Sequence, residues 1–312
     1  MKLSELVAVR EHLRTIYDTS GIANSVDGLV NQLADFVGSV PDSNLQSAVT
    51  DLALSVRSIH NRLYTCQPQY DNIIQALDQQ ISEVSSKFFS ENYHLELNYS
   101  NVDNIRKVRV MPISEQLRNE IATRIRLYTD WKYPALEIGC RDGEWTQFLV
   151  AADPLYIVDY YREFTESATQ NFTDEYKQRI RVYLSQDHDL SVLPAGQFNF
   201  VFSWNHINYL SLDTLKQYLK SVWNLLRPGG TFMFSYNNGD TEAGAGYAES
   251  YFMSYIPKSM LIPLCESLGF TITMTQDVLE NIAVSWIEIK RPGTLTTIKA
   301  HQVMGEIKPI TY

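Results

Sequence analysis

The amino-acid sequence predicts an α/β fold, a doubly wound and mainly parallel sheet with an α-helical module before it. Two patterns carry this prediction. Between residues 113 and 291, short apolar segments alternate with amphipathic ones, as parallel strands alternate with crossover helices. In residues 1–90, apolar side chains instead recur at steps of three and four, which is typical of helices that pack along one stripe.

The helical module at residues 1–90 contains three apolar seams with heptad spacing. We expect breaks between helices near Gly21, Pro41 and Pro68. Because each seam is short for a coiled coil by itself, it would be buried in an antiparallel hairpin or against a second chain. The module is therefore expected to be either a helical cap or a coiled-coil or bundle element for oligomerisation or docking. The seams are Ile22, Val26, Leu29, Leu33 and Phe36; Leu45, Val49, Leu52, Val56, Ile59 and Leu63; and Ile74, Leu77, Ile81, Val84 and Phe88.

A polar connection at residues 91–112 links the module to the sheet, and residues 292–312 form a C-terminal extension. Between these limits, the hydrophobic periodicity predicts seven strands and the helices that connect them. The predicted strands are one that starts at Ala135 and those at 155–159, 180–184, 198–204, 231–235, 271–276 and 283–290. The predicted helices are those at 115–128, 146–152, 164–172, 212–226 and 258–268.

The segment from Ala135 to Asp159 is the most informative part of the chain. A short apolar strand runs into a turn that carries Gly139 and Gly143, and a second strand ends in a carboxylate 22 residues after Glu137. Glycines let the backbone approach a ligand closely, and an acid at the end of the second strand can accept hydrogen bonds from both hydroxyls of a ribose. The segment therefore predicts a nucleoside-binding site.

These residues resemble the first two motifs of class I S-adenosylmethionine-dependent methyltransferases, with Glu137, Gly139, Gly143 and Asp159 in the motif positions. Residues 198–210 are similar to the fourth strand of that family and its following loop, and the Leu-Arg-Pro-Gly-Gly segment that begins at Leu226 is similar to its turn into the fifth strand. The resemblance covers roughly residues 113–291. It implies the class I methyltransferase fold, a seven-stranded sheet whose last two strands form a reversed hairpin at one edge, and S-adenosyl-L-methionine as the cofactor.

The resemblance also implies where the cofactor lies. The turn from Gly139 to Gly143 is expected against the methionine part, Asp159 against the ribose and Tyr160 over one face of the adenine. Asp187 or Asp189 is expected near the adenine amino group, although either aspartate could equally cap a surface turn. The expected cofactor-binding residues are Glu137, Gly139, Cys140, Arg141, Gly143, Asp159, Tyr160, Asp187, Asp189, Ser203 and Trp204.

Methyl transfer from a sulfonium is an in-line displacement, which needs proximity and a deprotonated nucleophile rather than a covalent residue. In the loop of residues 203–209, His206 is the candidate general base, since its unperturbed pKa is about 6.5; the alternative is that it packs at the edge of the cofactor. Residues 239–246 are expected to form a loop that covers the acceptor. No metal site is expected. The acceptor, an oxygen or nitrogen of a small molecule, glycan or protein, is not identified by these residues.

Two departures from the family pattern motivate an alternative function. Arg141 stands where the family usually has glycine, and Asn199 stands where it often has aspartate. We expect Arg141 to keep the turn while its side chain points outward, with its guanidinium approaching the carboxylate of the cofactor. The alternative is a structural or docking protein whose helices mediate assembly and whose methyltransferase-like domain is inactive or only binds cofactor.

A nicotinamide dehydrogenase is the nearest competing enzyme class, because it also combines a glycine turn with a distant acid. Its three glycines have the spacing G-x-G-x-x-G, whereas this chain spaces Gly139 and Gly143 four residues apart and places Glu137 before them. This difference disfavours the dehydrogenase.

Charge and cysteine content narrow the remaining classes. The net charge of −10 and the isoelectric point near 5.1 disfavour a nucleic-acid methyltransferase, because nucleic-acid affinity rests mainly on Lys and Arg. The three cysteines are too far apart for a disulfide framework or a CxxC metal pair, which favours a reducing compartment, the cytoplasm. No signal peptide or membrane span is expected. The expected partner is a second copy of the chain or another protein, bound through the N-terminal helices.

Overall fold

The computed structural model describes residues 2–17, 28, 31–32, 35, 43–90, 113–170, 172–185, 189–250, 253–279 and 283–293. They fall into two compact units. The helical unit comprises Met1–Glu91 and Thr241–Glu249, and the sheet unit comprises Asn92–Asp240 and Ser250–Tyr312. The predicted connection at 91–112 lies outside the described residues, as does all but the first two residues of the predicted extension at 292–312. No helix in the described ranges is long and apolar enough to cross a membrane.

Three helices of the helical unit have bounds in the described part of the chain. They are α1 (Leu3–Tyr17), α3 (Ser43–Ser90) and α9 (Glu242–Glu249). Helix α1 packs against both α3 and α9, and its buried face carries Leu3, Leu6 and Val7. On α3, Leu77 and Ile81 of the third predicted seam are buried. The N-terminal segment and the second half of α3 therefore share one small core.

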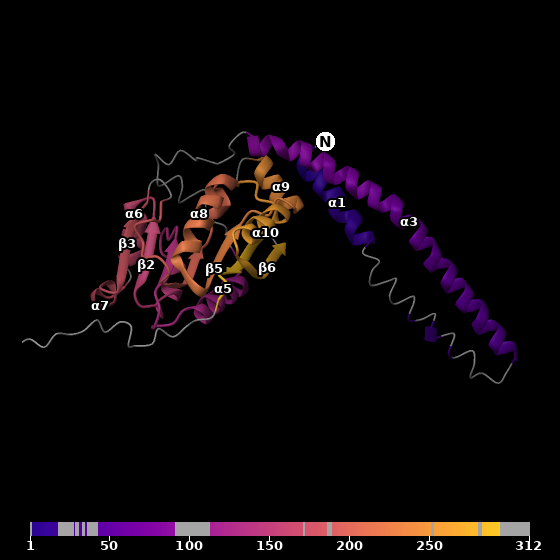
Figure 1. Cartoon of the computed structure of the whole chain (residues 1–312), viewed down its shortest axis with the longest axis horizontal. Coiled ribbons are helices and arrows are strands. Elements are labelled where there is room, and N and C mark those ends of the chain that lie inside the picture. The colour runs from indigo at the N-terminus through magenta and orange to yellow at the C-terminus, as the bar shows by residue number, and fades with distance from the viewer. Residues whose placement is uncertain are drawn as a thin grey trace, which may run out of the picture. The chain divides into compact units, whose positions relative to one another are not determined.

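The predicted break at Pro68 is wrong, because α3 runs through this proline as one helix of 48 residues (Figure 1). Proline in a helix interior removes one backbone hydrogen bond and bends the helix, but the bonds on either side remain. The first predicted seam lies outside the described residues. In the second seam, Val49 and Val56 are half-buried, and Leu52 is 52% exposed.

Residues 242–249 form helix α9 rather than the predicted loop. Thr241 begins the helix, because its Oγ1 accepts a hydrogen bond from the backbone N–H of Gly244 at 3.0 Å. The small residues Gly244 and Ala245 are buried, and the hydroxyl of Ser4 on α1 donates to Glu249 at 2.5 Å. The small side chains that suggested a loop thus allow two helices to approach each other closely.

The sheet unit contains seven strands in the order β3-β2-β1-β4-β5-β7-β6. The first five strands in sequence pair in parallel, and β7 pairs antiparallel with both β5 and β6. This is the predicted doubly wound sheet with a reversed hairpin at one edge. The strands are β1 (Ala135–Ile138), β2 (Leu155–Asp159), β3 (Ile180–Leu184), β4 (Phe198–Ser203), β5 (Leu226–Tyr236), β6 (Thr271–Leu279) and β7 (Ala283–Lys290).

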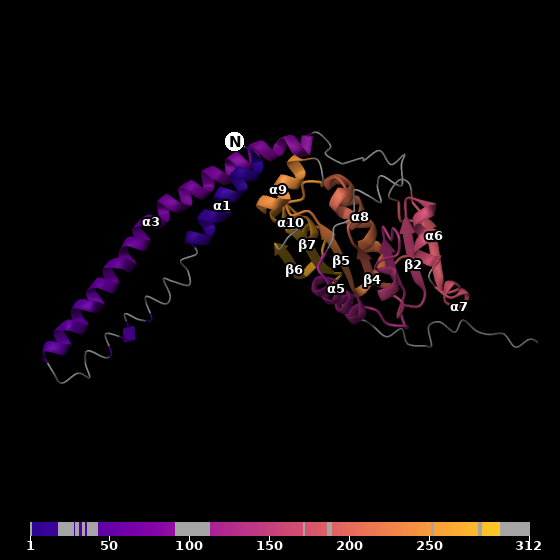
Figure 2. The same cartoon turned by 180° about the vertical axis from the view of Figure 1, so that it is seen from behind.

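Helices cover both faces of this sheet (Figures 1 and 2). Buried residues of α8 and α10 share one apolar cluster with the strands, and buried residues of α5 and α6 share the other. Strand β4 serves both faces, since Val201 joins the first cluster and Phe200 and Phe202 join the second. The helices are α5 (Glu115–Tyr128), α6 (Arg162–Gln170), α7 (Asp174–Lys177), α8 (Leu212–Leu225) and α10 (Lys258–Ser267), with 3-10 turns η1 (Thr146–Phe148) and η2 (Ile207–Tyr209).

The predicted helix at residues 146–152 is wrong, because only the 3-10 turn η1 forms there. Strand β2 already begins at Leu155, so the chain must reverse direction within a few residues of the turn after β1. Two apolar residues of the predicted helix, Leu149 and Ala152, are instead buried in the cluster that packs on the sheet.

Candidate functional site

The turn between β1 and η1 lies at the carboxyl end of the parallel strands, where open α/β sheets bind ligands. Gly139 (φ +75°), Arg141 (φ +47°) and Gly143 (φ +82°) all adopt left-handed backbone conformations. The Gly143 N–H donates to the Cys140 carbonyl at 2.9 Å and closes the turn, and the Gly139 N–H donates to the Val158 carbonyl at 2.8 Å. The second bond fixes the turn to strand β2.

Arg141 adopts the left-handed turn conformation at the position where the family pattern has glycine. A left-handed conformation costs a non-glycine residue about 1 kcal/mol. The backbone N–H of Arg141 donates to Oδ2 of Asp159 at 3.0 Å, and a hydrogen bond to a charged acceptor offsets a cost of this size.

Gly143 is required by packing rather than by closeness to a ligand. A Cβ atom added at Gly143 would lie 2.6 Å from Cα of Ala168 on α6. The absence of a side chain therefore lets α6 approach the turn, as the third glycine does in dinucleotide-binding folds.

Asp159 ends strand β2 and is 7% exposed. Its Oδ1 accepts from the backbone N–H of Tyr161 at 3.2 Å, in addition to the bond from Arg141. Burial raises the pKa of Asp159, and the backbone hydrogen bonds and the charge of Arg141 oppose that rise without cancelling it. The carboxylate is thus held in one orientation by the backbone of two elements.

Glu137 lies under the turn, on β1, and is 2% exposed. The hydroxyl of Thr146 donates to its Oε2 at 2.6 Å. Burial is the main cause that raises the pKa of Glu137 to about 8; the Thr146 hydrogen bond opposes the rise, and the charge of Asp159 adds to it. Burial, followed by the charges of Asp159 and Glu137, also raises the pKa of Cys140. At neutral pH, Glu137 is therefore mostly protonated.

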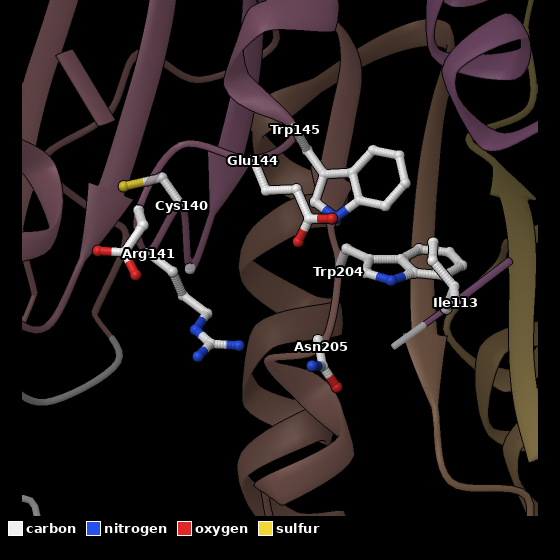
Figure 3. Close-up of a pocket in the computed structure, with 9 residues that line it drawn as sticks. Ile113, Cys140, Arg141, Glu144, Trp145, Trp204 and Asn205 are labelled. Atoms are coloured by element: carbon white, nitrogen blue, oxygen red, sulfur yellow. The ribbon is translucent and has the colours of Figure 1, made fainter. Parts of the chain in front are cut away.

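A first pocket opens beside the turn and encloses about 520 Å³ of space, part of it open to solvent. The rings of Trp145 and Trp204 form one wall, with centroids 5.5 Å apart. Arg141 and Asn205 approach this space from opposite sides (Figure 3). The lining residues are Ile113, Gly139, Cys140, Arg141, Asp142, Glu144, Trp145, Trp204 and Asn205.

A second pocket, which encloses about 290 Å³, lies on the other side of Gly139. Gly139 lines both pockets. The imidazole of His206 packs on it, because a Cβ added at Gly139 would lie 2.6 Å from Cγ of His206. The ring of Tyr218 meets His206 edge-on at 5.8 Å. The lining residues are Ile138, Gly139, Val158, Asp159, Tyr160, Ser185, His206 and Tyr218.

The loop after β4 is held in place by hydrogen bonds to the neighbouring strands. The Ser203 hydroxyl donates to the Ile138 carbonyl at 2.9 Å. The backbone N–H of Asn205, which has φ +56°, donates to Oγ of Ser235 at 2.7 Å, and the Ser235 hydroxyl donates to Asn208 at 2.8 Å. These bonds place Asn205 beside one pocket and His206 beside the other.

The structure distributes the predicted site residues over three places. Gly139, Cys140, Arg141 and Trp204 line the first pocket, and Gly139, Asp159, Tyr160 and His206 line the second. Glu137, Gly143 and Ser203 support the site by hydrogen bonding or packing and line neither pocket.

Asp189, one of the two predicted adenine contacts, lines neither pocket. Asp189 is exposed and accepts hydrogen bonds from the backbone N–H and the hydroxyl of Ser191, at 2.8 and 2.7 Å. Asp187 lies outside the described residues. Asp189 thus caps a local turn, the alternative that the sequence left open.

Sequence reasoning missed several lining residues, among them Trp145, Asn205 and Tyr218. Trp145 had a local signal, because it directly follows the glycine turn. Tyr218 lies on α8 and reaches the pocket only through tertiary packing, so no local pattern identifies it. Among the described residues, no group of three or more His, Cys, Asp or Glu side chains could hold a metal ion.

The strand order, the antiparallel β7 and the glycine turn after β1 define the class I methyltransferase fold. A dinucleotide-binding Rossmann sheet has the order 3-2-1-4-5-6 and no antiparallel strand inserted beside the fifth. The comparison of sequences agrees, since residues 135–230 match the family model of a methyltransferase domain. Over this range the sequence is therefore similar to a methyltransferase domain.

Several solved structures are similar to the chain at low sequence identity. An S-adenosylmethionine-dependent methyltransferase from Mesorhizobium loti is 14% identical with a TM-score of 0.44, and covers 54% of this chain and 96% of its own. The N-methyltransferase NodS from Bradyrhizobium japonicum, in complex with S-adenosyl-L-homocysteine, is 15% identical with a TM-score of 0.47, and covers 62% and 98%. The [4+2]-cyclase SpnF is 12% identical with a TM-score of 0.47, and covers 57% and 83%. No curated protein sequence matches the chain.

The residues of the site fit the cofactor of this family. The carboxylate of Asp159, at the end of β2, lines the second pocket. Gly139, which has no side chain and a left-handed backbone, lines both pockets. The first pocket lies on the other side of this glycine. An elongated ligand with a nucleoside at one end could extend from Asp159 past Gly139. The ring of His206 packs on this glycine, which lines both pockets.

Proposed function

We propose that the chain is an S-adenosylmethionine-dependent methyltransferase that transfers a methyl group to an oxygen or nitrogen of an acceptor. The observation that carries this proposal is the arrangement of Asp159 and the turn after β1 around two pockets that meet at Gly139. When bound, the cofactor supplies a methyl group on a positively charged sulfur. The protein has to orient this group, bring the acceptor into line and exclude water.

We assign the nucleoside to the second pocket and the methionine part to the first. Asp159 would accept hydrogen bonds from the ribose, and Tyr160 would cover one face of the adenine. Trp145 and Trp204 are 5% and 7% exposed, which makes their wall of the first pocket apolar and supports the exclusion of water there. Glu137 and Ser203 keep the strand ends and the β4 loop in position.

His206 has two candidate roles. As a general base it would take a proton from the acceptor; as a packing residue it would border the cofactor. Its contact with Gly139 and with the Tyr218 ring supports the second role. A His206→Ala variant that keeps its turnover with a known acceptor would exclude base catalysis, and a variant that binds cofactor but turns over slowly, with rescue by added imidazole, would support it.

The position of Asn199 supports an active enzyme over a degenerated one. Asn199 interrupts the register between β4 and β5, and its Nδ2 donates to the Tyr128 carbonyl at 2.8 Å. It stands near the beginning of β4, whereas the pockets are at the end of this strand, after Ser203. This departure from the family pattern therefore does not touch the proposed site.

The helical unit is proposed to mediate self-association or the binding of a partner protein. Leu52 and Leu54 of α3 are 52% and 59% exposed, and Leu52 belongs to a heptad seam. An apolar seam on a long helix is a common basis for coiled-coil pairing.

All three cysteines are free thiols, which supports a reducing compartment such as the cytoplasm.

The experiment that tests the proposed activity is the formation of S-adenosyl-L-homocysteine from S-adenosylmethionine, measured with fractionated small-molecule, glycan and protein acceptors. We expect product formation that depends on one acceptor fraction and disappears in the Asp159→Ala variant. A chain that binds cofactor tightly but forms no product with any fraction would support the docking alternative instead.

A further inference from the structure

Arg141 is the one arginine or lysine among the described residues that line the two pockets. Its side chain lines the first pocket, and its guanidinium end points toward Asn205 (Figure 3). The expectation that this side chain points outward, with its guanidinium approaching the carboxylate of the cofactor, stays a prediction, and a position along the pocket is compatible with it.

The acidic residues near Arg141 each have another interaction or contact with solvent. Glu144 forms an ion pair with Arg118 at 2.7 Å, and the positive charge of Arg118 offsets the negative charge of Glu144. Asp142 is exposed to solvent, which screens its interaction with a ligand. Asp159 is held mainly by backbone N–H groups, so the guanidinium is not required to orient it.

The backbone of Arg141 gives a second, independent argument. At φ +47° a glycine would make the same turn and the same N–H bond to Asp159 without the cost of a left-handed arginine. The turn by itself therefore gains nothing from the side chain. Strained residues that persist in a site point to a role of the side chain in that site.

We propose that the guanidinium of Arg141 binds the carboxylate of the methionine part of the cofactor and makes the site select ligands that carry this carboxylate. This inference rests on the proposed function. A guanidinium can donate two parallel hydrogen bonds to a carboxylate, and such charged pairs are stronger than neutral ones. The second pocket contains no such group among its described lining residues, so the two ends of the ligand are recognised by different chemistry.

The test compares three thioether ligands by isothermal titration with the full chain. S-adenosyl-L-homocysteine has the carboxylate, its decarboxylated analogue lacks only that group, and methylthioadenosine lacks the whole amino-acid part. We expect Arg141→Gly to lower the affinity for S-adenosyl-L-homocysteine by about tenfold or more, which is the effect of losing one hydrogen bond to a charged group. The affinities of the decarboxylated analogue and of methylthioadenosine should stay as in the unmodified chain.

Two results would overturn the inference. One is an unchanged or higher affinity of Arg141→Gly for S-adenosyl-L-homocysteine. The other is an equal loss of affinity for all three ligands. Such a loss would show that the substitution disturbs the turn or Asp159 rather than a contact with the carboxylate. Arg141→Lys keeps the charge but not the planar fork and should lose less affinity than Arg141→Gly.

The outcome for the proposed function is separate. If the unmodified chain binds neither S-adenosyl-L-homocysteine nor methylthioadenosine, the proposed cofactor is wrong. If it binds both and Arg141→Gly changes nothing, only the role of Arg141 is wrong. The variant should melt at the same temperature as the unmodified chain or higher, since glycine relieves the left-handed conformation.

Discussion

The backbone N–H of Arg141 donates a hydrogen bond to Oδ2 of Asp159 at 3.0 Å. This bond joins the turn after β1 to the end of β2. The two elements that we assign to opposite ends of one ligand are thus connected directly. A ligand that fixes Asp159 also fixes the turn, and the loss of this hydrogen bond is expected to reach both pockets.

The first prediction concerns Asp159. Replacing it by alanine removes the acceptor that we assign to the ribose, and we expect the affinity for S-adenosyl-L-homocysteine to fall by about 10- to 100-fold. Isothermal titration measures this loss. Asp189→Ala is the matched control, because Asp189 is exposed and bonds to Ser191. An equal affinity of both variants would show that Asp159 does not hold the ligand.

The second prediction concerns Gly143. Alanine at this position would be strained, because the backbone has a left-handed φ of +82°. Its Cβ would also lie 2.6 Å from Cα of Ala168. We expect the free energy of unfolding to fall by about 2–4 kcal/mol. Gly196 is the matched control, with φ +68° and no atom within 4 Å of an added Cβ, so Gly196→Ala should cost only about 1 kcal/mol. Chemical denaturation that ranks the two variants in the opposite order would refute the packing role.

The third prediction concerns the pH dependence of stability through Glu137. Burial raises the pKa of Glu137 from 4.5 to about 8 in the folded chain. Folded protein therefore holds a proton that the unfolded chain releases, and the contribution of Glu137 to stability is lost as pH rises through this window. Glu137→Gln does not titrate, so its stability relative to the unmodified chain should increase from pH 5 to pH 8, by at most about 5 kcal/mol.

Denaturation curves of the ligand-free chain at pH 5 and pH 8 measure this difference. If the difference in stability between the two proteins were the same at both pH values, Glu137 would be ionised throughout and the raised pKa would be excluded.

The fourth prediction concerns the helical unit. Leu52 lies on a heptad seam of α3 and Leu54 lies off it, although both are largely exposed. If the seam pairs with a second chain, Leu52→Glu should lower the molar mass measured by light scattering, and Leu54→Glu should leave it unchanged. A monomeric mass for the unmodified chain would refute self-association and leave binding of another protein.

The regular elements of the sheet unit could be predicted closely. Helix α5 has the predicted bounds, because Ser114 accepts a hydrogen bond from the backbone N–H of Leu117 and marks the first turn. Strand β2 also has its predicted bounds, because a buried apolar run ends there in Asp159. In these segments the local pattern and the tertiary environment favour the same structure.

The candidate site was predicted only in part, because its shape depends on contacts between distant segments. The glycine turn and Asp159 follow a spacing along the chain and were found. The contact of His206 with Gly139, the entry of Arg141 into the first pocket and the burial of α9 depend on packing that no local spacing reveals. For Asp189 the sequence left a contact with the adenine and a surface turn equally open, and its hydrogen bonds from Ser191 support the turn.

The measurement that tests the central claim most directly is isothermal titration of the full chain with S-adenosylmethionine and S-adenosyl-L-homocysteine. We predict that both ligands bind, with one site per chain and an affinity that falls by about 10- to 100-fold in Asp159→Ala. A folded chain that binds neither ligand would contradict the account, because the two pockets at Gly139 would then not form a cofactor site.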